Sequence, residues 1–215
     1  IYNAIIVPYL LPQSFVNYEI GGWARFNKIQ TELSLYQLNG TNEIVSVRQP
    51  DGVNLNQNTG STKHIGIEYK IIYTINALLE LSMNATNAKH QYQQTILKGV
   101  DISGKEMSAA PHFWGNTQLQ FNWSKQLNSS IEWQHQSSYF MDEINQTKYP
   151  GFDLLNFRTN YAIRKHSFWL HILNATNTYY STMATRNFSV KGNAAYSYYI
   201  GEPRSIQIGW KYQLF

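Results

Sequence analysis

Six histidines carry the most versatile chemistry in this sequence, because a neutral imidazole can bind a transition metal and a protonated one carries charge. They are His64, His90, His112, His135, His166 and His171. A metal centre needs ligands that converge on one point and partners that orient them. The six lie on different predicted strands and turns, with no i, i+4 pair on a helix. We therefore interpret them as separate wall residues and predict no metal site.

Motifs of the common catalytic centres are absent from the sequence. It contains no Gly-rich phosphate loop, no G-x-S-x-G elbow, no H-E-x-x-H and no cysteine. Its carboxylates alternate with basic residues in a way that suits ion pairs, such as Glu68 with Lys70, or Glu132 with Arg158 on adjacent strands. The net charge of +4 is scattered, which argues against nucleic acid as a partner. We predict that the chain is not an enzyme and has no cofactor.

Alternation of polar and apolar residues predicts the elements that position these groups. About nine segments show the period of two that is typical of half-buried strands. The clearest segments are residues 64–73, 79–86, 115–123, 131–136, 155–164 and 206–213. Weaker ones cover residues 16–26, 29–47 and 167–180.

The two faces of these strands differ in chemistry. One face carries the charges and is the predicted lumen lining: Glu68, Lys70, Glu80, Glu132, Arg158, Arg164 and Lys211. The other is apolar, and its large aromatic residues form a predicted membrane girdle: Trp123, Trp133, Tyr161, Trp210 and Tyr212. Only 14% of residues are charged while 15% are aromatic, which suits a β-sheet wall with one apolar face and one polar, hydrated face. A carbohydrate-stacking platform is the alternative for these aromatic residues.

The connections between segments alternate strictly between short and long. Short ones fall near residues 27–28, 75–77, 125–127 and 165–166, and long ones near 48–59, 96–111, 143–152 and 181–202. Outer-membrane barrels have this asymmetry, with short periplasmic turns and long extracellular loops. We predict an all-β, antiparallel transmembrane β-barrel segment of about nine strands. The odd strand count and the lack of a signal peptide predict that the chain begins within a longer protein.

Aromatic and cationic residues gather at the predicted extracellular ends. The candidate ligand-binding residues are Trp114, Tyr139, Phe140, Tyr149, Arg186 and Tyr198, with Tyr196 and Tyr199 beside them. Stacking and charge pairing by such groups would hold an anionic, aromatic-rich ligand. The alternative is that they pack the loops together or meet lipopolysaccharide.

Three stretches resemble the TonB-dependent receptor family. Residues 17–21 (Asn-Tyr-Glu-Ile-Gly), leading to Arg25-Phe26, look like the family's N-Y-E-x-G strand. Residues 173–180 are similar to the N-L-x-N-x-x-Y signature of the penultimate strand. Residues 201–205 (Gly-Glu-Pro-Arg-Ser), followed by Gly209 and Tyr212, resemble the closing G-x-P-R-x … G-x-x-Y-x-F. The aromatic Tyr212 lies three residues before Phe215, one more than is usual in the family.

The resemblance implies a 22-stranded, plugged barrel, of which residues 1–215 would be the C-terminal part, without the plug domain and the N-terminal strands. It implies an outer-membrane receptor that imports a scarce nutrient, foremost a ferric siderophore, with energy from the TonB complex. It also implies contact with outer-membrane lipid and lipopolysaccharide, and a terminal Phe215 read by the barrel-assembly machinery. The alternatives are a passive channel or structural barrel, or a soluble glycan-binding β-sandwich.

Overall fold

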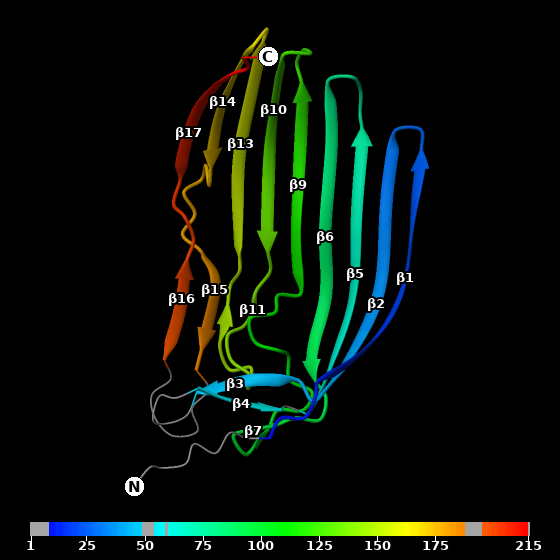
Figure 1. Cartoon of the computed structure of the whole chain (residues 1–215), viewed down its shortest axis with the longest axis vertical. Helices are drawn as coiled ribbons and strands as arrows, with labels where there is room; N and C mark the ends of the chain where they lie inside the picture. Colours follow the sequence, from blue (N-terminus) through cyan, green and yellow to red (C-terminus); the bar gives the residue numbers. More distant parts are fainter. Residues whose placement is uncertain (1–8, 49–53, 59, 188–194, 215) are drawn as a thin grey trace.

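Nine long strands form one antiparallel sheet in chain order (Figure 1). The computed structural model describes residues 9–48, 54–58, 60–187 and 195–214. The strands are β1 (Ser14–Phe26), β2 (Ile29–Thr41), β5 (Ser61–Thr74), β6 (Leu79–Tyr92), β9 (Phe113–Asn122), β10 (Leu127–Gln136), β13 (Phe152–Ile163), β14 (His166–Leu173) and β17 (Ser205–Tyr212). Each pairs with the next along the chain, which leaves β1 and β17 at the two edges. The prediction of an all-β, antiparallel arrangement of about nine strands is confirmed. Among the described residues, no helix is long and apolar enough to span a membrane.

Short and long connections lie at opposite ends of the sheet (Figure 1). The tight turns are residues 27–28, 75–78, 123–126 and 164–165. Each long connection contains a small hairpin of its own: β3–β4 (Ile44–Arg48, Asn54–Asn58), β7–β8 (Ile96–Leu97, Val100–Asp101), β11–β12 (Tyr139–Phe140, Lys148–Tyr149) and β15–β16 (Ser181–Arg186, Tyr196–Ile200). The predicted alternation of short and long connections is confirmed, whereas the small hairpins were not predicted.

Two of the weaker sequence segments end earlier than predicted. The segment 29–47 is interrupted at Asn42, which adopts the left-handed region at φ 56°. The segment 167–180 ends at Leu173, because Asn174 turns the chain at φ 48° and its side chain bonds the backbone of Thr178 in both directions at 2.8 and 2.9 Å. Asparagine tolerates this conformation and favours such turns.

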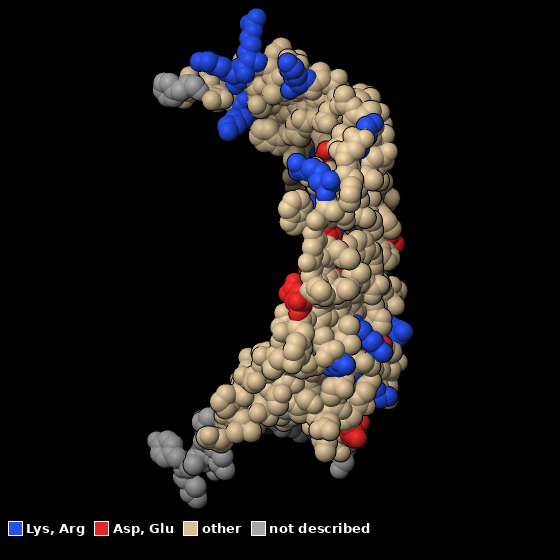
Figure 2. All heavy atoms as spheres, turned by 90° about the vertical axis from the view of Figure 1, so that its right-hand side faces the viewer, with Lys and Arg blue, Asp and Glu red and all other residues tan. Residues whose placement is uncertain are grey.

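The pairing register separates polar from apolar residues, as the alternation predicts. Lys70 lies opposite Glu32, whereas Leu170 lies opposite Ile208 on the other face. The sheet is bowed into a crescent, with acidic side chains on its hollow side (Figure 2). Apolar residues on the other face stay exposed, Ile208 by 80%. A wall that faces lipid with one side and water with the other has this character.

Aromatic rings cover glycines on neighbouring strands at two points of the hollow face. Tyr36 lies over its cross-strand partner Gly66, and Trp169 lies over Gly209. A β-carbon at either glycine would overlap the ring. Such aromatic–glycine pairs help to fix the register of a curved sheet.

The hydrophobic core of the described residues lies under the loops and not within the sheet. One cluster consists of Tyr92, Leu97 and Ile102, and a second of Tyr139, Met141, Tyr149 and Ala184. Both lie where the long connections fold over the ends of the strands. The connections that contain the β7–β8, β11–β12 and β15–β16 hairpins are thus packed against one another as a cap.

Candidate functional site

Charged residues of the hollow face form ion pairs across neighbouring strands. Lys70 Nζ lies 3.6 Å from Glu32 Oε1, and Glu80 accepts a hydrogen bond from Thr74 Oγ1 at 3.3 Å. The pairing of Lys70 with Glu68 proposed from the sequence is wrong. Residues two apart on one strand are separated by about 7 Å, whereas a cross-strand neighbour is about 5 Å away.

Glu132 is the most densely bonded carboxylate of this face. It is buried and accepts hydrogen bonds from Asn116 on β9 and from Asn156 and Arg158 on β13, the two strands beside β10. The predicted Glu132–Arg158 pair is therefore confirmed. The two asparagines were missed, because their role depends on a register that the sequence alone does not fix.

Arg164 does not belong to the predicted lumen lining. β13 ends at Ile163, and Arg164 lies in the following two-residue turn at φ 53°. The alternation was counted one residue too far into the turn. Lys211 keeps its predicted place on the polar face, opposite Ser167 of β14.

A wide cavity opens along the hollow face over β1, β2, β5, β6 and β9. Its volume is about 780 Å³ and its lining includes Glu19, Trp23, Glu32, Glu68, Lys70 and Trp114. Because β1 and β17 are the open edges of the sheet, this cavity is a concave stretch of wall and not an enclosed pocket. Glu19, Trp23 and Glu32 were not among the predicted site residues, because they lie on the weaker segments.

The predicted ligand-binding residues separate into an exposed and a buried group. Trp114 is 63% exposed and Tyr198 is 53% exposed. Tyr139 and Tyr149 are only 3% and 7% exposed. Their hydroxyl groups accept hydrogen bonds from the backbone N–H groups of Ala184 and Ser181, each at 2.7 Å. These two tyrosines hold β15 onto the β11–β12 hairpin, which is the loop-packing alternative given for them above.

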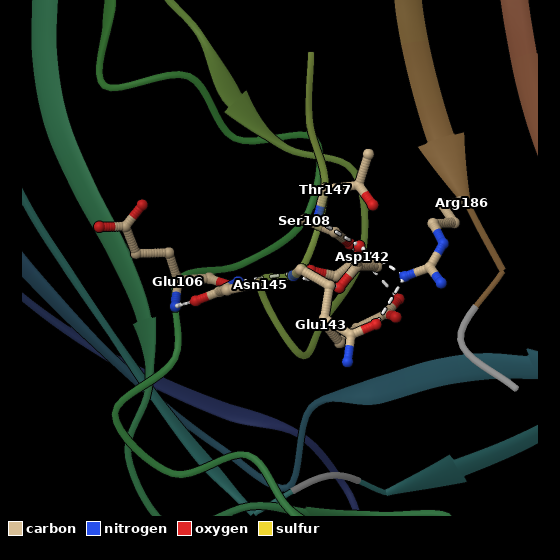
Figure 3. Close-up of polar contacts among 8 residues, drawn as sticks. Glu106, Ser108, Asp142, Glu143, Asn145, Thr147 and Arg186 are labelled. Carbon is tan, nitrogen blue, oxygen red and sulfur yellow. Dashed lines mark hydrogen bonds and ion pairs between the residues drawn. The ribbon is translucent and has the colours of Figure 1, made fainter. Parts of the chain in front are cut away.

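A buried carboxylate fastens the loops together (Figure 3). Asp142 is fully buried and accepts hydrogen bonds from the backbone N–H groups of Gln146 and Thr147 at 2.9 and 3.0 Å. Its third partner is Arg186, whose Nη1 lies 3.3 Å from Asp142 Oδ2 and 3.0 Å from Gln146 Oε1. The predicted ligand residue Arg186 is thus engaged within the protein. Phe140 lies under Lys148 Nζ at 4.6 Å.

The neighbouring loop joins this network through Asn145, at φ 59°. Its side chain accepts from the backbone N–H of Glu106 and donates to the carbonyl of Glu106, both at 2.8 Å. Glu143 lies beside it, and burial raises the pKa of this carboxyl above its ordinary value. Three long connections are therefore linked by polar contacts at one end of the sheet (Figure 3).

The outer face carries the predicted girdle residues. Trp123 stacks on Phe121 and donates to Ser129 Oγ at 3.2 Å. Trp133 donates to Asp153, and Trp210 to His166, at 2.8 and 3.0 Å. Tyr161 and Tyr212 are part-exposed on the same face. Phe215 lies outside the described residues.

Two histidines that the sequence placed apart lie together. His64 and His90 are cross-strand partners on β5 and β6, and their Nδ1 atoms are 2.7 Å apart. The expectation of separate histidines is wrong for this pair. Two others have carboxylate partners, His112 with Glu106 at 3.1 Å and His135 with Asp153 at 2.8 Å.

Comparisons with known proteins agree with this architecture. The family model described as TonB dependent receptor-like, β-barrel matches residues 1–177. A search of curated proteins found no match. Several solved structures share the fold, at sequence identities below 20%.

The siderophore receptor PiuA from Acinetobacter baumannii has a TM-score of 0.71 and 18% identity, over 91% of this chain and 28% of that one. The ferric yersiniabactin uptake receptor FyuA from Yersinia pestis has a TM-score of 0.73 and 12% identity, over 94% and 30%. The ferripyoverdine receptor of the outer membrane of Pseudomonas aeruginosa has a TM-score of 0.66 and 17% identity, over 95% and 28%. The chain spans less than a third of their length. From the family match and the shared fold, the chain belongs to the TonB-dependent receptor-like β-barrel family.

Proposed function

We propose that the receptor containing this chain imports a metal chelate, foremost a ferric siderophore, across the bacterial outer membrane, with energy from the TonB complex. Membership of the family supports the transport role. The three structures described above are those of a siderophore receptor, a ferric yersiniabactin uptake receptor and a ferripyoverdine receptor. Because this chain spans less than a third of each, the role belongs to the longer protein.

The observation that carries the proposal is the contrast between the two faces of the sheet. The hollow face offers a cavity of about 780 Å³ with carboxylates, amides and a lysine in its wall. Lys70 pairs with Glu32, while Glu19 and Glu68 give the wall an excess of acidic side chains. A wall of this kind can pass a polar cargo, while the apolar outer face suits lipid. We infer that the outer face meets membrane lipid and, near the loops, lipopolysaccharide.

Ligand contact is best assigned to the exposed aromatic residues at the loop end. Trp114 lines the cavity and stays largely exposed. Tyr196, Tyr198 and Tyr199 are exposed along β16, and Tyr196 stacks on Tyr198 with centroids 6.5 Å apart. Flat, exposed rings can stack on an aromatic chelate. Tyr139, Tyr149 and Arg186 contribute by holding the loops in place.

A binding titration tests this assignment. The full-length receptor is purified in detergent, and its tryptophan fluorescence is followed during addition of ferric catecholate, hydroxamate and carboxylate siderophores. The proposal expects saturable quenching by one class, and at least roughly tenfold weaker binding in Trp114→Ala, since a stacking anchor contributes about 1.4 kcal/mol or more. Trp123→Phe, on the outer face, is the control. Failure of every chelate to bind would contradict the cargo class.

A further inference from the structure

A pair of histidines faces one another at the loop end of β5 and β6. His64 lies directly opposite His90 in the register. Their ring centroids are 5.0 Å apart and their Nδ1 atoms 2.7 Å apart. The side chain of His64 is only 14% exposed. One proton therefore lies between two imidazole nitrogens in a sheltered place.

The second nitrogen of His64 has its own partners. His64 Nε2 lies 3.1 Å from Thr62 Oγ1, and Thr62 in turn donates to Glu43 Oε1. The same carboxylate oxygen lies 3.6 Å from His64 Nε2. A hydroxyl that donates to a carboxylate accepts the Nε2 proton of His64. The lone pair of Nδ1 is then directed at His90. Partners of this type orient metal-binding histidines in proteins.

The two nitrogens are close enough to share one metal ion. Bonds of 2.0–2.1 Å place two ligand nitrogens about 2.9 Å apart at 90°, and about 3.3 Å apart at the tetrahedral angle. The 2.7 Å between the two Nδ1 atoms is the length of their hydrogen bond, so a bound ion requires the two rings to part slightly. Imidazole nitrogens bind several divalent transition metals, and Cu²⁺ forms the strongest complexes among them.

Space for the remaining ligands lies beside the pair. A cavity of about 400 Å³ is lined by both imidazoles, with Ala88, Met107 and Trp114 around them. The described residues contain no group of three or more His, Cys, Asp or Glu side chains placed to hold a metal ion. The protein would thus supply two nitrogens, and water or an incoming molecule the other donors.

We propose that His64 and His90 form a two-nitrogen site for Cu²⁺, with its open coordination positions in this cavity. The ion displaces the proton between the two Nδ1 atoms, and His90 carries its proton on Nε2 instead. Both rings stay neutral, so no net proton is released. The site goes beyond the import of a ferric chelate and does not depend on it.

The test is a Cu²⁺ titration of the full-length receptor, purified from outer membranes and stripped with a chelator. Electron paramagnetic resonance counts the coordinating nitrogens. We expect a signal from two coordinating nitrogens in the wild-type receptor. In His64→Gln and in His90→Gln we expect the loss of one nitrogen and at least roughly tenfold weaker Cu²⁺ binding. His171→Gln is the matched control, since His171 lies on β14 and outside the cavity lining. Zn²⁺ should bind more weakly than Cu²⁺.

Unchanged affinity and nitrogen count in both variants would overturn the site, as would an equal loss in the control. If a variant fails to assemble, the site is tested by chemical modification of the wild-type receptor. Diethyl pyrocarbonate modifies accessible imidazoles, and peptide mapping locates them. Cu²⁺ should slow the modification of His64 and His90 at least roughly tenfold and leave His171 unaffected. Equal rates with and without Cu²⁺ would refute the proposal.

Discussion

Removal of the Asp142 carboxylate should release the loops from one another. Asp142 is fully buried, and its two oxygens hold the backbone N–H groups of Gln146 and Thr147 and the guanidinium of Arg186. Asp142→Ala deletes all three contacts without adding bulk. The side chains of Arg186 and Gln146 still bond one another at 3.0 Å, so part of the link to β15 remains and the loss concentrates on the 142–147 turn.

The magnitude follows from the contacts. Each N–H···carboxylate bond contributes about 1.5 kcal/mol at the lower end of its range, hence about 3 kcal/mol for two. The ion pair between Asp142 and Arg186 is partly screened by water, because the Arg186 side chain is partly exposed. It adds about 1 kcal/mol. A total of about 4 kcal/mol corresponds to a roughly thousandfold change in the opening equilibrium of the loops.

Hydrogen exchange read by mass spectrometry measures this opening in the purified receptor. The amides of Gln146 and Thr147, and that of Arg186, which donates to the carbonyl of Met141 at 2.8 Å, should lose protection by about three orders of magnitude. Amides of β5 and β6 should keep theirs. Asp153→Ala, which removes an exposed aspartate of the outer face, is the control. A loss below roughly tenfold at these loop amides, or an equal loss in the control, would refute the idea that Asp142 fastens the loops.

Three further predictions concern charge and packing. Burial raises the pKa of Glu143, so the folded loop binds this proton more tightly than the unfolded chain, and its stability falls as pH rises through the raised pKa. Glu143→Gln should therefore increase loop protection at pH 7 but not near pH 4; a gain that is the same at both values would contradict this. Arg158→Leu should destabilise the barrel by about 2 kcal/mol in urea unfolding from lipid vesicles, because it leaves the carboxylate of Glu132 uncompensated, and Glu132→Gln in the same protein should recover most of the loss. Gly209→Val should drive the ring of Trp169 off the sheet and lower the folded fraction on heat-modifiability gels, whereas Gly22→Ala, with open space around it, should not.

Alternation of polar and apolar residues, together with the spacing of the turns, predicted the antiparallel sheet of about nine strands. The clear segments became long strands with one polar and one apolar face, and this leaves a period of two in the sequence. The same pattern placed Glu68, Lys70 and Glu132 on one face and Trp210 and Tyr212 on the other. It failed at Arg164, because a turn residue happened to continue the alternation.

Contacts between distant residues were not predictable in the same way. Tyrosine is common in ligand-binding sites, which is why Tyr139 and Tyr149 were predicted to bind the ligand. Their burial depends on how the small hairpins pack, and no local sequence pattern predicts that packing. The pairing of His64 with His90 depends on register. Once the tight turn at 75–78 pairs Thr74 with Glu80, His64 lies ten residues before Thr74 and His90 lies ten residues after Glu80. Counting residues outward from the turn on both strands could therefore have predicted that the two histidines pair.

Uptake of radiolabelled ferric siderophore tests the central claim most directly. Cells that lack the receptor gene are complemented with the full-length receptor, in one host with TonB and in one without it. We expect saturable uptake of one siderophore class that needs both the receptor and TonB. Uptake that is equal without TonB would identify a passive channel, and receptor-independent uptake of every chelate would contradict the import of metal chelates altogether.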